Sequence, residues 1–238
     1  MPSSGTHFSL QDIEALPERY RANFINSLSG FKSASLLGST DGRSNNLAII
    51  SSVVHVGANP PLLGIIMRPH TVQRDSLSNI KQQGNFTLNH VHTSWTDKAH
   101  QTSARYENGV SEFEEVGLTP WFSDTFSAPY VKESAVNIGL KVEQHFTLCN
   151  QTEMVIGEIQ EVFIKGSNIS ERAVSGNRIT VNGASGFSAV ESVIAENGFV
   201  DENGYVDIES LHTACVSGLD SYHSTQKIAQ YPYAKPKT

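Results

Sequence analysis

The chain has 238 residues and a mass of 26.0 kDa, enough for one large domain or two small ones. Its 24 acidic and 17 basic residues give a net charge of −7, and Lys and Arg form no cluster, so nucleic-acid binding is not expected. No apolar run approaches the roughly 18 residues of a membrane helix, and the N-terminus does not resemble a signal peptide. We therefore expect a cytoplasmic protein without membrane contact, in which Cys149 and Cys215 are buried free thiols.

The first forty residues predict two helices followed by a hairpin. Segments 10–16 and 19–28 carry apolar residues at helical spacing, and Pro17 prevents one continuous helix. Residues 31–37 are a candidate strand. Asp41-Gly42 is typical of the turn between two antiparallel strands.

The next segment predicts two strands and a helix. Residues 47–56 are expected to return as one antiparallel strand, which ends at Pro60-Pro61 because proline cannot donate to a β-ladder. Residues 62–67 form the next expected strand. Segment 72–82 has helical spacing, and Gly84 is a typical helix terminator.

The remainder indicates mainly β-structure, with strands expected at 86–91, 135–147, 154–165, 178–181, 190–195 and 205–208. The lengths of the 135–147 and 154–165 runs suit strands that curl around a barrel. The polar segment 94–127, helical near 94–106, is expected to cover another part of the protein rather than to form core. Residues 211–233 are expected to be loop and short helix.

Ser51-Ser52 interrupts an apolar run that should be packed interior. Buried hydroxyls need partners, and serine often bonds to neighbouring backbone. Alternatively, the hydroxyls and adjacent N–H groups face an anionic ligand. The residues alone favour the first interpretation.

The surrounding motifs resemble a known family. In order, they are Gly38-Ser39-Thr40-Asp41-Gly42, Asn45-Asn46-Leu47-Ala48, Ser51-Ser52-Val53, Asn59-Pro60-Pro61-Leu62, Arg68-Pro69, Asp75-Ser76-Leu77-Ser78-Asn79-Ile80, Gly218-Leu219-Asp220-Ser221-Tyr222 and Tyr233-Ala234-Lys235-Pro236. Their order and spacing are similar to those of the flavin reductase-like proteins, and the resemblance covers about 24–235.

The resemblance implies a single domain, 1–238, that is mainly β (α+β). This fold is an antiparallel split β-barrel of the FMN-binding type with a few peripheral helices and an insertion at 94–127. It also implies a homodimer with FMN at the subunit interface, and an oxidoreductase in which NAD(P)H binds transiently and passes a hydride to the flavin. No catalytic side chain is named, because the cofactor carries the chemistry.

The same resemblance implies the site residues. The flavin phosphate is expected to bind the Ser51 and Ser52 hydroxyls and the amide of Val53, with a charge-assisted contact from Arg68. Without the resemblance, Arg68 would be interpreted as a solvent-exposed residue at the end of a strand.

Asn45, Asn46, Leu47 and Ala48 are expected at the polar edge of the flavin ring, with Asn46 supplying donors and an acceptor, and Ser76 completes the set. The plain alternatives are that Asn46 is a turn residue and that Ser76 belongs to a helix N-terminus.

Two other functions remain open. The first is an FMN-binding electron carrier without turnover of free flavin. The second is a barrel for another ligand, lined by His55, His90 and His92. His90, His92 and His100 suggest no metal site, because no acidic or cysteine ligands join them.

Overall fold

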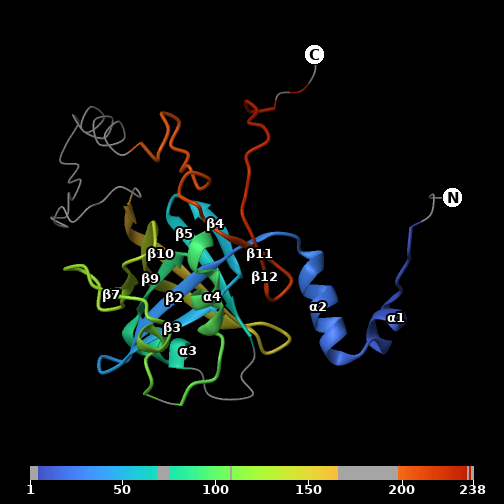
Figure 1. The fold of residues 1–238 in the computed structure, drawn as a ribbon, viewed down its shortest axis with the longest axis horizontal. Helices are drawn as coiled ribbons and strands as arrows, with labels where there is room; N and C mark the ends of the chain where they lie inside the picture. The colour runs from blue at the N-terminus through green and yellow to red at the C-terminus, as the bar shows by residue number, and fades with distance from the viewer. Residues whose placement is uncertain (1–4, 69–74, 108, 166–197, 235, 237–238) are drawn as a thin grey trace.

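The computed structural model describes residues 5–68, 75–107, 109–165, 198–234 and 236, and these form an antiparallel split β-barrel (Figure 1). The main sheet has seven strands in the order β3-β2-β6-β9-β10-β5-β4, accompanied by a three-stranded sheet, β1-β11-β12, and by the pair β7-β8. The strands are β1 (Lys32–Ser33), β2 (Ser35–Thr40), β3 (Asn45–Ile50), β4 (Val53–Ala58), β5 (Pro61–Met67), β6 (Asn85–His90), β7 (Pro120–Trp121), β8 (Tyr130–Val131), β9 (Val136–Thr147), β10 (Glu153–Ile164), β11 (Cys215–Ser217) and β12 (Ser221–His223). The helices are α1 (Leu10–Ala15), α2 (Glu18–Leu28), α3 (Asp75–Gln83), the 3-10 turn η1 (Thr93–Trp95), α4 (Thr96–Gln101) and α5 (Glu112–Val116). The expected fold class is confirmed.

The two N-terminal helices lie beside the barrel (Figure 1). Ser9 caps α1 through a reciprocal capping box with Asp12. Pro17 directly precedes α2, and its fixed φ angle suits the start of a helix. Neither helix contains a buried residue. Both predicted helices are confirmed, but the barrel core does not hold them.

Strand β2 is buried along its whole length on both faces. Because successive side chains of a strand point to opposite faces, Leu36 and Leu37 belong to two different hydrophobic clusters. The inner cluster fills the barrel and consists of Leu37, Ile65, Met67, Leu77, Ile80, Phe86, Leu88, Leu140 and Val155. The outer cluster covers the other face of β2.

The outer cluster corrects the expectation for segment 94–127. Ala99, Phe113, Val116 and Leu118 are all buried in this cluster, where they pack with Leu36 and its neighbours. The segment therefore covers β2, as expected, but it does so with side chains that are part of the core. Its polar composition concealed this role, because only one side of each short helix faces inward.

The expected strand at 47–56 is two strands. It breaks at Ser51-Ser52, after which the chain crosses from β3, at one edge of the sheet, to β4, at the opposite edge. The prediction of one strand was wrong, because a strand cannot continue where its backbone must change partners from β2 to β5.

Four other predictions need correction. The 31–37 run is divided between β1 and β2, which belong to different sheets, and 211–233 contains strands β11 and β12 instead of a helix. At 205–208 only one bridge forms, between Val200 and Val206. The strands expected at 178–181 and 190–195 lie outside the described residues. Both thiols are free, but Cys149 is exposed and only Cys215 is buried.

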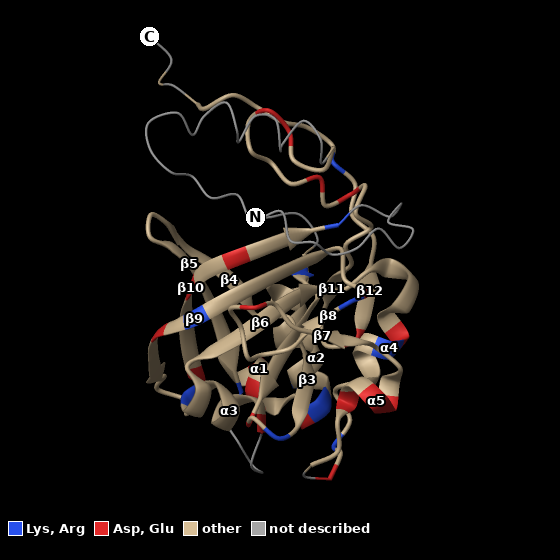
Figure 2. Ribbon diagram, turned by 90° about the vertical axis from the view of Figure 1, so that its left-hand side faces the viewer, with Lys and Arg blue, Asp and Glu red and all other residues tan. Residues whose placement is uncertain are grey.

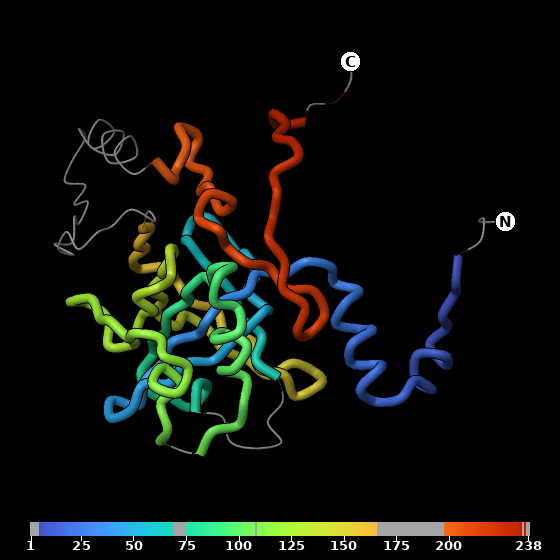
Figure 3. The backbone as a smooth tube through the Cα atoms, in the orientation of Figure 1, coloured from blue at the N-terminus to red at the C-terminus, as the bar shows by residue number. Residues whose placement is uncertain are grey.

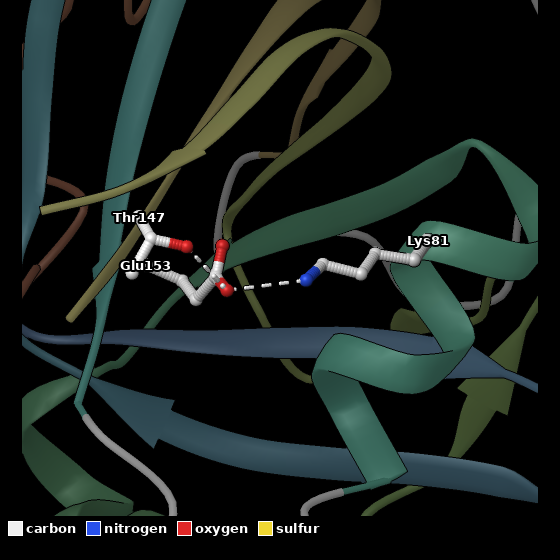
Figure 4. A network of polar contacts seen from close by, with 3 residues as sticks. All are labelled: Lys81, Thr147 and Glu153. Carbon is white, nitrogen blue, oxygen red and sulfur yellow. Dashed lines mark hydrogen bonds and ion pairs between the residues drawn. The ribbon is translucent and has the colours of Figure 1, made fainter. Parts of the chain in front are cut away.

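The 135–147 and 154–165 runs form the long hairpin β9–β10, as predicted, and a polar contact joins it to α3 (Figure 4). Glu153 Oε1 accepts hydrogen bonds from Lys81 Nζ at 3.2 Å and from Thr147 Oγ1 at 3.1 Å. Burial opposes ionisation of Glu153, but these donors outweigh it and lower the pKa of the carboxyl group. The charged pair therefore helps to hold α3 against the barrel.

Gly38→Ala should destabilise the fold, because a Cβ atom there would collide with the carbonyl oxygen of Pro129 and the hydroxyl of Thr87. We expect a loss of about 3 kcal/mol in the free energy of unfolding, measured by urea denaturation. Gly5→Ala is the control, because no heavy atom approaches its Cβ position. Equal stability of the two variants would contradict the close packing of β2 against the β8 segment.

Candidate functional site

The corner between β3 and β4 is fixed by Ser52. Its Oγ donates to the carbonyl oxygen of Ile66 at 2.6 Å and accepts from the amide of Ile66 at 3.3 Å. A serine has one hydroxyl proton, so Ser52 has none left to donate to a ligand through its side chain. The backbone interpretation of the Ser-Ser pair is therefore correct for Ser52.

Ser51 differs from its neighbour. It is half-buried, and within the described residues no hydrogen bond involves its hydroxyl. Val53, where β4 begins, pairs with Ile65. The corner therefore offers one uncommitted hydroxyl donor, which suits an anionic oxygen.

Arg68 follows directly after β5, two residues beyond the Ile66 backbone that holds Ser52. The side chain is exposed, and Nη2 donates to Asn26 Oδ1 of α2 at 3.2 Å. A guanidinium group has five N–H donors, so most of them remain available. Arg68 and the Ser51-Ser52 corner thus share one region of the barrel.

Asn46 lies elsewhere, buried on β3, where Glu112 of α5 binds it. Its Nδ2 donates to both Glu112 oxygens, at 2.8 and 2.7 Å, and the amide of Leu47 donates to Glu112 Oε2 at 2.9 Å. The donors expected to meet the flavin edge are therefore occupied by a carboxylate of the protein. A ligand at this point would have to displace Glu112.

Ser76 meets the other end of the Asn46 amide. Its Oγ donates to Asn46 Oδ1 at 2.6 Å, and the Ser39 hydroxyl also approaches that oxygen, at 3.3 Å. Asn79 Nδ2 in turn donates to Ser39 Oγ at 3.4 Å. Ser76 is buried in the first turn of α3, so its hydroxyl joins α3 to β3.

A polar depression lies beside the hydrogen-bonded network of Asn46 and Asn79, and the residues that line the depression determine which ligands could bind there. Asn45 and Asn46 line it together with Asp41 and Asp75, and among the described residues that line it there is no Lys or Arg. Glu112 of α5 binds Asn46, which lines the depression, and Figure 2 shows the acidic colouring of α5. A phosphate here would meet negative charge, whereas the corner beside Arg68 offers positive charge.

The structure therefore divides the predicted residues into two groups. The first group is on β3 and α3: Asn46 is in contact with Ser76, and its neighbours along β3 are Asn45, Leu47 and Ala48. The second group is at the β3–β4 corner and consists of Ser51, Ser52, Val53 and Arg68. Glu112, Ser39 and Asn79 were missed. For Glu112 the sequence offered no signal, since it lies 66 positions from Asn46.

The histidines have separate surroundings. The Nδ1 atom of His92 accepts from the Ser94 amide at 3.0 Å, and its ring packs against His212, whereas His100 approaches the Tyr222 hydroxyl. His90 has a buried Nδ1 without a partner in the described chain. In that same part of the chain, no three potential ligands gather as a metal site would require.

The strand order defines a split β-barrel, and the comparisons identify its family. A model of the flavin reductase like domain matches residues 28–177. The chain therefore belongs to the flavin reductase-like family.

Individual relatives agree with this assignment. A protein of Shewanella frigidimarina NCIMB 400, assigned as a flavin reductase with a split barrel domain, is 43% identical, with a TM-score of 0.80 over 97% of this chain and 100% of its own. Nitrilotriacetate monooxygenase component B of Bacillus cereus shares the fold at 17% identity, with a TM-score of 0.74 over 96% and 100% of the two chains. The uncharacterized protein YwrF of Bacillus subtilis is 28% identical over 126 residues, which are 50% of this chain and 62% of that protein. The chain thus matches less than two thirds of YwrF.

No helix in the described residues has the length and apolar character needed to cross a membrane.

His90 should make the stability of the barrel depend on pH. Burial lowers its pKa from 6.5 to about 4, so the unfolded chain takes up a proton at a higher pH than the folded chain does. The stability contribution of neutral His90 is present above pH 6.5 and is lost as the pH falls toward 4. Between pH 7.5 and 4.5 the loss should reach ~2.5 kcal/mol, at about 1.4 kcal/mol per pKa unit.

Urea denaturation at these two pH values tests this, with His90→Gln as the variant that cannot titrate. The acid-induced loss should be smaller in His90→Gln by that amount. An equal loss in both proteins would show that His90 is accessible to protons in the folded state.

Proposed function

We propose that the chain is an FMN-binding oxidoreductase that takes electrons from NADH or NADPH. Its family supports a flavin cofactor. The observation that carries the proposal is the β3–β4 corner: the Ser51 hydroxyl has no hydrogen-bond partner in the described residues, and its neighbour Ser52 is bound to Ile66, two residues before the exposed Arg68. This donor set fits a phosphomonoester, which carries negative charge and accepts several hydrogen bonds.

The residues of the chain then have distinct roles. Ser51 donates its hydroxyl proton to the phosphate, Arg68 supplies charge-assisted hydrogen bonds, and the amides at 51–53 complete the concavity. Ser52 holds the corner in shape through Ile66. FMN, when bound, supplies the hydride-accepting chemistry, so these residues bind and orient and need not transfer a proton.

Asn45, Leu47 and Ala48 remain our candidates for the polar edge of the ring. Asn46 can bind the ring with them only if Glu112 moves away, because the side-chain amide of Asn46 now donates to both oxygens of the Glu112 carboxylate. Ser76 acts indirectly: since its proton is given to Asn46, it fixes the orientation of the Asn46 amide.

Ser51→Ala should weaken FMN binding by about 5- to 30-fold, as expected for the loss of one charge-assisted hydrogen bond worth ~1–2 kcal/mol. Riboflavin, which lacks the phosphate, should bind equally well to both proteins. Fluorescence titration measures both affinities, and Ser103→Ala, at an exposed serine, is the control. Unchanged FMN affinity in Ser51→Ala would reject the phosphate assignment.

Absorbance spectra of the wild-type protein distinguish the oxidoreductase from the electron carrier and from a barrel that binds no flavin. Under anaerobic conditions, flavin bands that bleach on addition of NADH or NADPH support the oxidoreductase. Bands that persist indicate a carrier with another electron donor, and a protein that binds no flavin excludes both functions.

We further propose that a second copy of the chain covers the edge strand β4. Val54 and Val56 are 39% and 41% exposed there, and both side chains pack over Gly64 on β5. The N-terminal helices and the C-terminal segment 224–234 also extend from the barrel, with no buried residue in either helix (Figure 3). Such unpaired apolar edges favour association.

Val54→Asp/Val56→Asp should convert a dimer into a monomer, because two charges would be buried without partners. Sedimentation velocity measures the mass, and Val206→Asp, at a valine of 37% exposure outside the main sheet, is the control. A wild-type monomer, or a variant that remains dimeric, would contradict the assignment of β4 to the interface.

A further inference from the structure

Lys32 and Arg68 form a pair of neighbouring cations that the sequence does not place together. Lys32 belongs to β1, and Arg68 follows β5. Both hold Asn26 of α2: Lys32 Nζ donates to the Asn26 carbonyl oxygen at 3.1 Å, and Arg68 Nη2 donates to Asn26 Oδ1 at 3.2 Å. Lys32 Nζ also donates to the carbonyl oxygen of Gly218 at 3.0 Å.

The acceptors of this pair are all neutral. Burial lowers the pKa of Lys32, and the positive charge of Arg68 lowers it further. The ion pair seen in the described residues is Lys81–Glu153, which involves neither cation. Because no carboxylate of the described residues pairs with either cation, the two charges repel one another, and a bound anion would relieve that repulsion.

The pair also has hydrogen-bond donors to spare. Two of the three N–H groups of the Lys32 ammonium are used, and one of the five of the Arg68 guanidinium. The Ser51-Ser52 corner adjoins them, since Ser52 bonds to Ile66, two residues before Arg68. The two cations therefore share Asn26 and keep free donors, and the strand that ends at Arg68 also anchors the Ser51-Ser52 corner.

We propose that Lys32 and Arg68 together bind a phosphate group, with Lys32 as a phosphate ligand. This rests on the proposed function, which supplies two sources for the group: the phosphate of FMN or a phosphate of the nicotinamide dinucleotide. The pair neutralises the anion from two elements, and Asn26 of α2 holds both cations in position.

The competing explanation is structural. Asn26 lies in the last turn of α2, where carbonyl groups lack helical partners, and a lysine often caps such carbonyls. Capping explains Lys32 alone. It does not explain why a second cation shares the same asparagine, because one positive charge satisfies a helix C-terminus.

Lys32→Gln and Arg68→Gln test the proposal. The matched control is Lys98→Gln, because Lys98 also donates to a carbonyl oxygen, that of Gly117 at 3.0 Å. FMN and riboflavin affinities are measured by fluorescence titration, and the KM for NADH and NADPH by steady-state oxidation. If the phosphate is that of FMN, each variant should bind FMN about tenfold more weakly and riboflavin equally well. If it belongs to the dinucleotide, KM should rise about tenfold while FMN affinity is unchanged.

Three outcomes would overturn the proposal. The first is that both variants keep wild-type values for every ligand, and the second is that FMN and riboflavin weaken equally, as a purely structural role predicts. If the wild type binds no flavin, the proposed function fails, and inorganic pyrophosphate titrated by calorimetry decides the subsite alone. If the wild type binds pyrophosphate and Arg68→Gln does not, the phosphate subsite is supported. If the wild type does not bind pyrophosphate, the subsite is rejected, and this is the third outcome. Arg68 is exposed, so Arg68→Gln tests its half of the pair even if Lys32→Gln does not fold, and Lys32→Met, which keeps the apolar stem but removes the charge and the donors, then takes the place of Lys32→Gln with the same expected outcomes.

Discussion

The burial of β2 on both faces is the constraint on which the rest of the structure depends. A strand covered on one side only can leave its other face in water, but Leu36 and Leu37 point in opposite directions and both are fully buried. The barrel supplies one cover. The other must come from outside the sheet, and the 94–127 segment provides it through Phe113 and its neighbours.

That second cover brings Glu112 to the barrel. The same short helix that buries Phe113 places the Glu112 carboxylate against Asn46 and the Leu47 amide, at the end of the sheet where β3 begins. Packing and polar bonding thus coincide, and the Asn46 amide is oriented from both sides, by Glu112 and by Ser76. Toward the other end of β3 the amide of Ile49 donates to Thr102 Oγ1, and beyond it the half-buried Ser51-Ser52 corner is followed by β4.

Charge separates these two ends. Asp41 and Asp75 line the depression beside Asn45 and Asn46, whereas Lys32 and Arg68 have no carboxylate partner in the described residues. A phosphate-bearing ligand is attracted to one end and repelled from the other. The corner therefore supports the proposed flavin site more strongly than the Asn46 network does.

The sequence by itself determined the features that depend on neighbouring residues: the two N-terminal helices around Pro17, the Asp41-Gly42 turn, the β9–β10 hairpin, and the ordered motifs that indicate the family. These follow from local backbone preferences and from side-chain periodicity. Only the tertiary structure decided that β3 and β4 occupy opposite edges and that Ser52 is bound to backbone, while the Ser51 hydroxyl has no partner in the described residues. It also decided that Glu112 binds Asn46 and that Lys32 and Arg68 share Asn26. Each of these depends on which strands pair across the barrel, and such long-range pairing leaves no periodic signal in the chain.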